Sequence, residues 1–188
     1  MKRHTPQMAR LLPEYIKTAR LVLRPPMPQD ADEIFAAYCQ DPEVCRYMVW
    51  APHVAVEVTR QFIDWCISAQ TGNSVFPYML VRESDGQVLG MLDARSTEHG
   101  LNIGYVLARQ HWGHGYMSEA IQSFTEIAFL QPTLFRIEAT CDVENHQSAR
   151  VLEKSNFVRE GRLARHTVHP NLSPEPRDCW IYARRLQV

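Results

Sequence analysis

The chain has 188 residues, which is the size of one domain with enough material to bury a hydrophobic core. Hydrophobic residues make up 45% of it and charged residues 22%, values typical of a folded globular protein rather than a disordered one. The 20 Lys and Arg residues nearly balance the 21 Asp and Glu residues, so no overall positive field favours nucleic acid or an anionic membrane as a partner.

The cysteines and the apolar segments favour a cytoplasmic protein. Five cysteines are scattered along the chain without a CxxC pair, which favours reduced thiols. The basic start leads into no apolar core of secretory length, and no later segment has the length of a membrane span. We therefore expect a single domain over residues 1–188, with its core at about 18–186 and an N-terminal extension at 1–17.

Alternation and helical spacing predict the elements of the first half of the chain. The segment RLVLRPP (20–26) alternates polar and apolar residues, which is typical of a short strand. Asp30 and Glu33 have the spacing of a capping box and precede apolar residues at helical intervals, so a helix is expected there. A second helical pattern runs over residues 58–69.

Three antiparallel strands follow these helices. Alternating segments separated by turn residues predict strands at 76–81, 87–95 and 101–108, with turns at 84–86 and 98–100.

The second half of the chain begins where the apolar period changes. From Gly115 the apolar residues fall three and four apart until Pro132, which predicts a helix. The remaining predicted elements are a strand, a helix and two strands, at 134–143, 145–154, 157–166 and 180–186. The segment 167–176 carries three prolines and is expected to be a loop or an arm. This order predicts a mixed sheet with helices on its faces.

The segment QHWGHGY (110–116) lies where a predicted strand gives way to a predicted helix. The first backbone N–H groups of a helix lack intrahelical partners and, with the helix dipole, form a site for phosphate. Gly113 and Gly115 would let a pyrophosphate approach those groups, although glycine pairs also serve as plain turn residues. The patterns of the Rossmann fingerprint and of the Walker loop are absent from the sequence.

Two motifs at separate places resemble one family. The spacing QxxGxG, formed by Gln110, Gly113 and Gly115, resembles the coenzyme A loop of the GNAT superfamily of N-acetyltransferases. IGYVLARQHWGHGYMSEAI (103–121) is similar to the strand, loop and helix of its Rim-type branch, which acetylates protein N-termini. ENHQSARVLEKSNF (144–157) resembles that branch's second motif, ENxxSxxVLEKxGF. The resemblance implies an α/β (α+β) fold with a mixed, mostly antiparallel seven-stranded sheet, flanked by helices and splayed between its fourth and fifth strands.

The resemblance also implies the cofactor and the residues that hold it. Acetyl-CoA would be the co-substrate, with its pyrophosphate on the segment 110–117 and its pantetheine along the backbone of Leu107. The implied cofactor residues are Leu107, Gln110, Trp112, Gly113, His114, Gly115, Tyr116, Met117, Asn145 and Lys154. His111 and His114 form an HxxH pair, but a zinc site needs further ligands, so no metal is expected.

Acetyl transfer requires stabilisation of an oxyanion and a proton for the departing thiolate. In the family, backbone N–H groups of the splayed strand, here 105–107, polarise the thioester carbonyl. Many members protonate the sulfur with a tyrosine, whose position here is Leu152, so Ser148 is the expected acid. The alternative is that Ser148 only serves the helix end beside an Asn145 cap.

The group that would deprotonate the amine is less clear. Rim-type sequences often carry a carboxylate at the position of Asn102, and the other candidates are Asp93, Glu138, His99 and His146, each of which has an ordinary structural role as its alternative. An α-amine with a pKa of about 7.7–8.0 is already neutral to roughly a tenth at pH 7, whereas a lysine amine at about 10.4 is almost wholly charged. The absence of a carboxylate at this position therefore favours amines of low pKa.

Two functions follow from these expectations. The first is an acetyl-CoA-dependent N-acetyltransferase in which a peptide α-amine or a small amine attacks the thioester directly. The second is a non-catalytic acyl-CoA sensor of the same fold, suggested by Asn102 and Leu152.

Asn156 replaces a glycine of the second motif, and asparagine tolerates the left-handed conformation. The prolines of 170–176 lengthen a loop that in the family often shapes the acceptor pocket. The resemblance also makes a homodimer a candidate assembly for this chain, because many family members form one.

Overall fold

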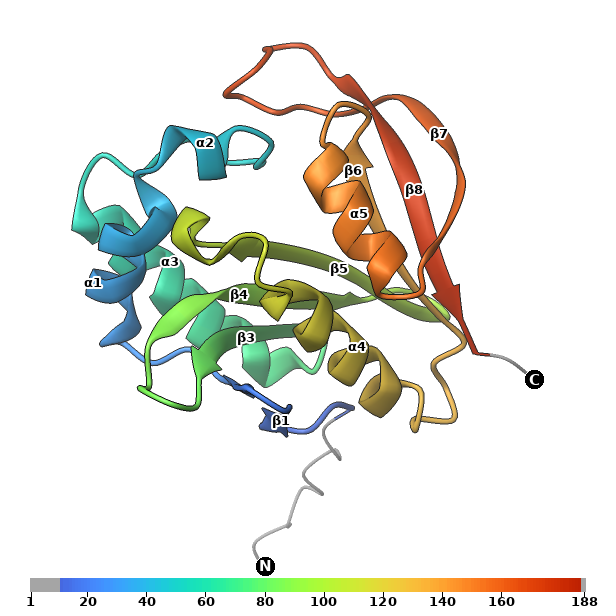
Figure 1. Ribbon diagram of the computed structural model, residues 1–188, viewed down its shortest axis with the longest axis horizontal. Coiled ribbons are helices and arrows are strands. Elements are labelled where there is room, and N and C mark those ends of the chain that lie inside the picture. Colours follow the sequence, from blue (N-terminus) through green and yellow to red (C-terminus); the bar gives the residue numbers. More distant parts are fainter. Residues whose placement is uncertain (1–10, 187–188) are drawn as a thin grey trace, which may run out of the picture.

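The computed structural model describes residues 11–186 and shows one twisted sheet with helices on both faces (Figure 1). Within these residues eight strands lie in the order β1-β2-β3-β4-β5-β6-β8-β7. Their bounds are β1 Ile16–Lys17, β2 Leu21–Arg24, β3 Val75–Arg82, β4 Val88–Ser96, β5 Gly100–Leu107, β6 Arg136–Asp142, β7 Val158–Thr167 and β8 Arg177–Arg185. Only β5 and β6 run parallel among the described neighbours, which confirms the mixed, mostly antiparallel sheet.

The helices lie between these strands in the predicted order, with one addition. They are α1 Asp30–Ile34, α2 Pro42–Cys45, α3 Val56–Ala69, α4 Tyr116–Ala128 and α5 His146–Lys154, and a π-helical segment, Phe35–Cys39, continues α1. The sequence did not predict α2, because four residues are too few to show a helical period. Its start is nevertheless well formed, since the Asp41 carboxylate accepts a hydrogen bond from the Glu43 N–H at 3.0 Å. No helix within residues 11–186 is long and apolar enough to cross a membrane.

The expected count of seven strands was wrong by one. The eighth strand is β1, where Ile16 and Lys17 pair with β2. Two residues show no alternation, so the pattern could not reveal it. Leu12 and Ile16 are both buried in the main core, so part of the expected extension packs against the domain. Residues 1–10 of that extension lie outside the described part of the chain.

Alternation along the central strands builds a core on each face of the sheet. In β3, Tyr78 and Leu80 pack in the core that includes Phe124 of α4. The residues between them point the other way, and Met79 packs in the core that includes Ile63 of α3. Helices α4 and α5 therefore lie on one face, and α1 and α3 cover the other (Figure 1).

The sheet opens between β5 and β6. The two strands pair only where residues 100–102 meet residues 136–138, whereas β5 continues beside β4 as far as Leu107. A Cβ atom at Gly100 would lie 1.9 Å from the Arg136 carbonyl oxygen, so only glycine allows the strands to meet this closely. The opening confirms the expected splay, whose fourth and fifth strands are β5 and β6.

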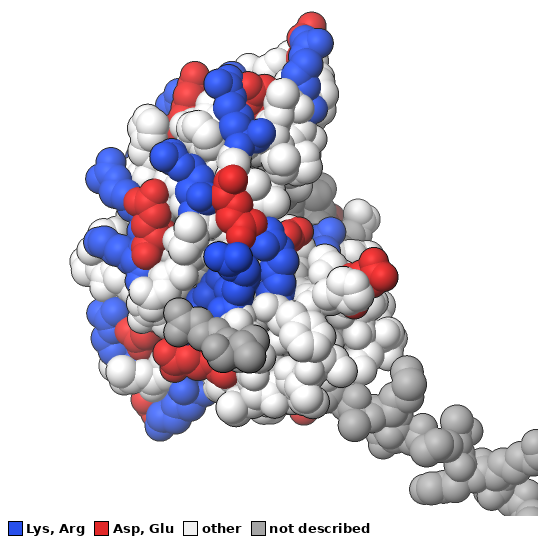
Figure 2. All heavy atoms as spheres, turned by 90° about the vertical axis from the view of Figure 1, so that its right-hand side faces the viewer, with Lys and Arg blue, Asp and Glu red and all other residues white. Residues whose placement is uncertain are grey.

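The sheet ends at β7, an edge strand with mostly exposed residues. Figure 2 shows that Lys and Arg alternate with Asp and Glu over the side of the molecule where β7 and β8 lie. Several of these charges are paired, as in Arg162 with Asp178 at 2.5 Å and Arg136 with Glu160 at 2.7 Å. Mixed charges along an edge strand discourage pairing with another sheet.

The capping box expected at Asp30 and Glu33 was wrong. Asp30 lies inside α1 and is buried, and its carboxylate binds Arg24 at 2.6 Å and the Met27 N–H at 2.7 Å. Glu33 accepts a hydrogen bond from the Val88 N–H at 2.7 Å instead of capping the helix. Both carboxylates therefore join α1 to the segments around it, a use that spacing alone does not distinguish from capping.

The Asp30→Ala variant is expected to lose about 3 kcal/mol of unfolding free energy, because it leaves the largely buried Arg24 guanidinium without its partner. Asp32→Ala is the matched control, since Asp32 pairs with Arg60 at an exposed site and should cost at most about 1 kcal/mol. Urea denaturation of both variants measures the difference. Equal losses in the two variants would contradict the role given to the buried pair.

Candidate functional site

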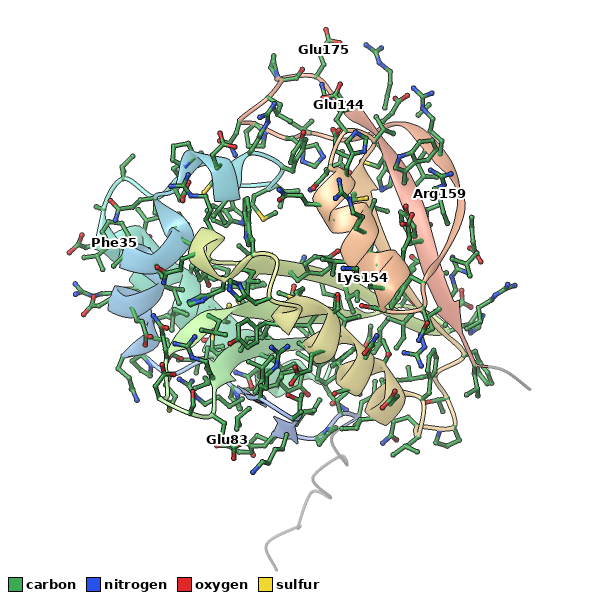
Figure 3. All side chains as sticks on the ribbon, in the orientation of Figure 1. Phe35, Glu83, Glu144, Lys154, Arg159 and Glu175 are labelled. Carbon is green, nitrogen blue, oxygen red and sulfur yellow. The ribbon has the colours of Figure 1, made fainter. Side chains whose placement is uncertain are left out.

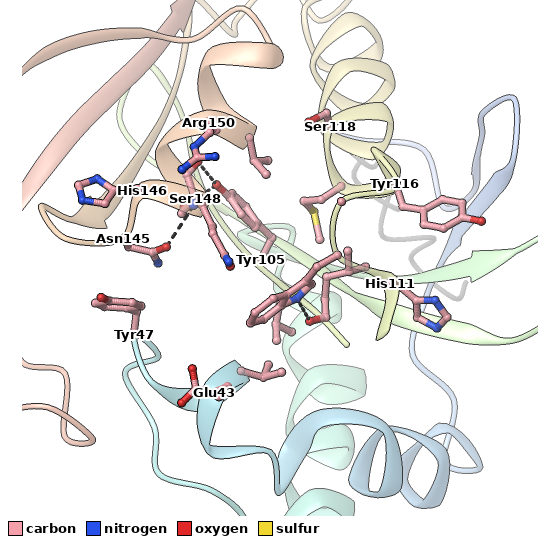
Figure 4. A pocket seen from close by; sticks show the side chains of 18 of the residues that line it. Glu43, Tyr47, Tyr105, His111, Tyr116, Ser118, Asn145, His146, Ser148 and Arg150 are labelled. Carbon is pink, nitrogen blue, oxygen red and sulfur yellow. Dashed lines mark hydrogen bonds between the residues drawn. The ribbon is translucent and has the colours of Figure 1, made fainter. Parts of the chain in front are cut away.

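A cavity of about 670 Å³ lies where β5 and β6 separate. Figure 4 shows its walls, which come from α2 and the residues after it, the end of β5, the loop and first turn of α4, and one face of α5. These segments span residues 43–154, and Figure 3 shows Lys154 and Glu144 near the two ends of α5. Nine of the eleven predicted catalytic and cofactor residues line this cavity, and the two that do not are Gln110 and His114.

The loop before α4 has the geometry of an anion site. Gly113 and Gly115 both have a φ of 79°, in the left-handed region that favours glycine. Gly115 is the N-cap of α4 and offers no side-chain acceptor to the first turn of that helix. The N–H groups of Tyr116 and Met117 therefore have no intrahelical partner, and both residues line the cavity. A Cβ atom at Gly113 would meet nothing within 4 Å, so this side of the loop is open.

Arg20 holds the outer side of the loop in place. Its guanidinium binds Glu119 of α4 at 2.7 Å, donates to the His114 carbonyl oxygen at 3.1 Å, and lies 4.3 Å from the centre of the Tyr116 ring. Burial acts to raise the pKa of Glu119, but hydrogen bonds from Thr18 and Arg20 outweigh it and lower the pKa. Arg20 thus holds the loop on the side away from the cavity, while Gly113 and Gly115 line the cavity.

Two expected cofactor residues do not line the cavity with their side chains. Gln110 is exposed, and its amide nitrogen lies 3.3 Å from His111 Nε2. His114 is also exposed and stacks on Tyr116, with ring centres 6.1 Å apart. His111 does line the cavity, and burial lowers its pKa. Among the described residues, no group of three His, Cys, Asp or Glu side chains is arranged to hold a metal ion.

The end of β5 turns its backbone toward the cavity. The Ala108 N–H donates to the Leu89 carbonyl oxygen of the β4 side at 2.9 Å. Because backbone groups alternate sides along a strand, those of Tyr105 and Leu107 point away from β4 and into the opening. Trp112 occupies one of them, since its indole Nε1 donates to the Leu107 carbonyl oxygen at 2.8 Å. The N–H groups of Tyr105 and Leu107 therefore face the cavity.

The first turn of α5 places Ser148 at the opposite wall. Asn145 caps the helix by accepting a hydrogen bond from the Ser148 N–H at 3.1 Å, as predicted. The Ser148 hydroxyl does not cap the helix, because it lies 2.7 Å from the Tyr105 hydroxyl (Figure 4). Lys154, the last residue of α5, also lines the cavity. Asn156 follows the helix with a φ of 63°, which confirms the left-handed conformation expected there.

Three of the four side chains considered as bases lie away from the cavity. Asp93 pairs with Arg95 at 2.7 Å, Glu138 pairs with Arg136 at 2.9 Å, and His99 is exposed. Only His146 lines the cavity among these four. Leu152, at the position where the family pattern would have a tyrosine, is fully buried in the main core. The Ser148 hydroxyl therefore has no such tyrosine beside it on α5.

Glu43, Tyr47 and Tyr105 are among the cavity residues that the sequence did not single out. Glu43 belongs to the unpredicted helix α2, and Tyr47 follows it and donates to the Glu144 carbonyl oxygen at 3.4 Å. The strand alternation of IGYVLA put Tyr105 on one face of β5, but only the structure shows which element lies opposite. The arm after β7 also reaches this wall, since the Asn171 amide donates to the Cys45 and Trp50 carbonyl oxygens at 2.6 and 2.8 Å.

Comparisons with known proteins agree with this architecture. Residues 20–158 match a protein family described as "Acetyltransferase (GNAT) domain". The uncharacterized N-acetyltransferase p20 of Bacillus licheniformis is 33% identical over 155 residues, which are 80% of this chain and 85% of that protein. The crystal structure of a GNAT-family acetyltransferase from Bacillus anthracis is 29% identical, with a TM-score of 0.79, and the match covers 91% of this chain and 98% of that one.

A more distant structure shows the same fold. RimL, a ribosomal L7/L12 alpha-N-protein acetyltransferase in complex with coenzyme A, is 21% identical with a TM-score of 0.81, over 92% of this chain and 98% of its own. The domain match covers residues 20–158, which is well over half of the chain. The match with the Bacillus licheniformis protein covers 80% of this chain and 85% of that protein. The chain therefore belongs to the GNAT family of acetyltransferases and is an N-acetyltransferase that uses acetyl-CoA.

Proposed function

We propose that residues 1–188 act as one domain that transfers the acetyl group of acetyl-CoA to a peptide α-amine or a small amine by direct attack on the thioester. The observation that carries this proposal is the single cavity in the opening of the sheet. It joins the glycine loop before α4, the outward backbone of β5 and the Ser148 hydroxyl. An anion site, a strand edge and a proton donor are the three parts that the reaction needs.

The cofactor would lie along the loop and the β5 edge. The N–H groups between Gly113 and Met117 would receive the pyrophosphate, and the Leu107 N–H would pair with pantetheine. Gln110 and His114 would contribute through the backbone of the loop, because their side chains lie outside the cavity. The other cofactor residues proposed are those that line the cavity walls, namely Trp112, Tyr116, Asn145 and Lys154.

The chemical step would use the β5 backbone and Ser148. A backbone N–H of Tyr105 or Leu107 would stabilise the oxyanion that forms when the amine attacks the thioester carbonyl carbon. When the C–S bond breaks, the Ser148 hydroxyl would give its proton to the thiolate. The Ser148 hydroxyl is available for this role because Asn145 caps the helix through the Ser148 N–H instead.

The acceptor amine would lie against the wall formed by α2 and the residues after it, close to the Glu43 carboxylate. Glu43 and Tyr47 form this wall, and Figure 4 shows the Glu43 carboxylate below Tyr47 on α2. A carboxylate near the mouth would attract a protonated amine, and an α-amine needs little further help because roughly a tenth of it is neutral at pH 7. RimL acts on an alpha-amino group of a ribosomal protein, which supports a peptide acceptor here.

The direct test is release of free thiol from acetyl-CoA with a panel of amines. We expect saturable release with short peptides that have a free N-terminus or with a small amine of low pKa, and little release with an N-terminally blocked peptide that offers only lysine. Saturable binding of acetyl-CoA without release above background for any amine would instead indicate a non-catalytic sensor.

Gly113→Glu is expected to abolish measurable coenzyme A binding without unfolding the protein, because it places bulk and negative charge where the pyrophosphate would lie. The control is Gly86→Glu, since Gly86 also has a positive φ, of 74°, and open space around its Cβ position, but lies in the turn before β4. Calorimetry with coenzyme A compares the two variants. Unchanged affinity in Gly113→Glu, with Gly86→Glu as the reference, would refute the anion site.

Ser148→Ala is expected to lower kcat by about a hundredfold, as for the loss of a general acid, while the affinity for acetyl-CoA changes little. Ser123→Ala on α4 is the control, because Ser123 is half-buried and does not line the cavity. Steady-state thiol release and calorimetry separate the two effects. A wild-type kcat in Ser148→Ala would remove the serine from the proton transfer.

A further inference from the structure

The Tyr105 hydroxyl reaches from β5 to the first turn of α5, at the opening where β5 and β6 separate. Tyr105 lies on β5, three residues beyond Asn102, where pairing with β6 ends. Its hydroxyl lies 2.7 Å from Ser148 Oγ and donates to the Ser148 carbonyl oxygen at 3.2 Å. Both residues line the cavity, and Figure 4 shows the tyrosine ring reaching α5 from the strand below it. The Tyr105 side chain therefore connects β5 to helix α5 beyond the point where the pairing of β5 with β6 ends.

The direction of this hydrogen bond decides what Ser148 can do. A serine hydroxyl carries one proton. If Ser148 donates it to Tyr105, the proton is held against the strand and is not available in the cavity. If Tyr105 donates to Ser148 Oγ, the Ser148 proton is free to point at another acceptor in the cavity. The Tyr105 hydroxyl lies near two acceptors of Ser148, its carbonyl oxygen and its Oγ. A small rotation of the Tyr105 hydroxyl therefore changes one arrangement into the other.

Tyr105 is suited to donate and not to lose its own proton. Burial raises its pKa well above the ordinary value for tyrosine, although the hydrogen bond with Ser148 acts to lower it. The phenol therefore stays neutral at any working pH of the enzyme. A neutral donor that faces a serine oxygen stabilises negative charge on that oxygen as it forms.

We propose that Tyr105 is a positioning residue for acetyl transfer, which donates its hydroxyl hydrogen bond to Ser148 Oγ and so directs the Ser148 proton at the sulfur of acetyl-CoA. The inference rests on the proposed function. As the C–S bond breaks, its electron pair stays on sulfur, and sulfur takes the Ser148 proton. Tyr105 stabilises the negative charge that develops on Ser148 Oγ, and the proton lost by the attacking nitrogen restores the serine hydroxyl. Acetyl-CoA and an amine thus give an amide and free thiol.

The test is a double-mutant cycle with Tyr105→Phe, Ser148→Ala and the double variant, assayed by thiol release in the full-length protein. Tyr105→Phe keeps the ring and removes the hydroxyl, so kcat is expected to fall by about tenfold while KM for acetyl-CoA stays unchanged. In the Ser148→Ala background, the same substitution is expected to have no further effect on kcat. A role that acts only through Ser148 requires this non-additivity.

Tyr182→Phe is the matched control, because the Tyr182 hydroxyl also makes a side-chain hydrogen bond, to Glu153 at 3.0 Å, but does not line the cavity. Its kcat should stay at the wild-type value, and thermal unfolding shows that each variant is folded. Equal losses of kcat from Tyr105→Phe in both backgrounds, or no loss in either, would overturn the inference. A wild-type protein that releases no thiol with any amine would overturn the proposed function instead.

Discussion

The short parallel pairing of β5 with β6 is the constraint on which the rest of the site depends. The strands meet over three residue pairs and then separate, while β4 continues to hold β5 to its end. Gly100 allows this contact, because any side chain there would collide with the Arg136 backbone. Beyond it, β5 has one paired edge and one open edge. The N–H groups that would have continued the parallel ladder become the wall of a cavity instead.

The helix that connects the two strands supplies the second part of the site. A crossover between parallel neighbours must return over one face of the sheet, so α4 begins beside the end of β5. Its first turn therefore directs unpaired N–H groups at the same opening. Arg20 pairs with Glu119 and donates to the His114 carbonyl oxygen, so its guanidinium stabilises the loop conformation. The unpaired backbone N–H groups of the loop and the first turn remain directed at the cavity.

The remaining walls come from segments that are distant in the sequence. Helix α2 carries Glu43 toward the cavity, and the arm between β7 and β8 is anchored to that region by Asn171. Tyr47 donates to the Glu144 carbonyl oxygen before α5, so the wall beside α2 contacts the wall that carries Ser148. The site is thus closed by side-chain hydrogen bonds in the places where no strand pairing holds its parts together.

The sequence by itself determined the elements that depend on local chemistry. The glycines of the α4 loop, the Asn145 cap and the left-handed Asn156 were predictable, because turn conformations and helix ends depend on a few neighbouring residues. The long strands and helices followed from their alternation or helical period. Two motifs were long enough to identify the family, and the splay of the sheet came with it.

Tertiary structure alone decided which side chains meet. Strand β1 and helix α2 are too short to have a period, and packing stabilises them. Asp30 has the spacing of a helix cap, yet its carboxylate forms an ion pair with the largely buried Arg24 of β2. Nothing local to Tyr105 shows that Ser148, 43 residues later, lies within hydrogen-bond distance. Such contacts depend on how far β5 and β6 diverge beyond residue 102, which the alternation of neither strand reveals.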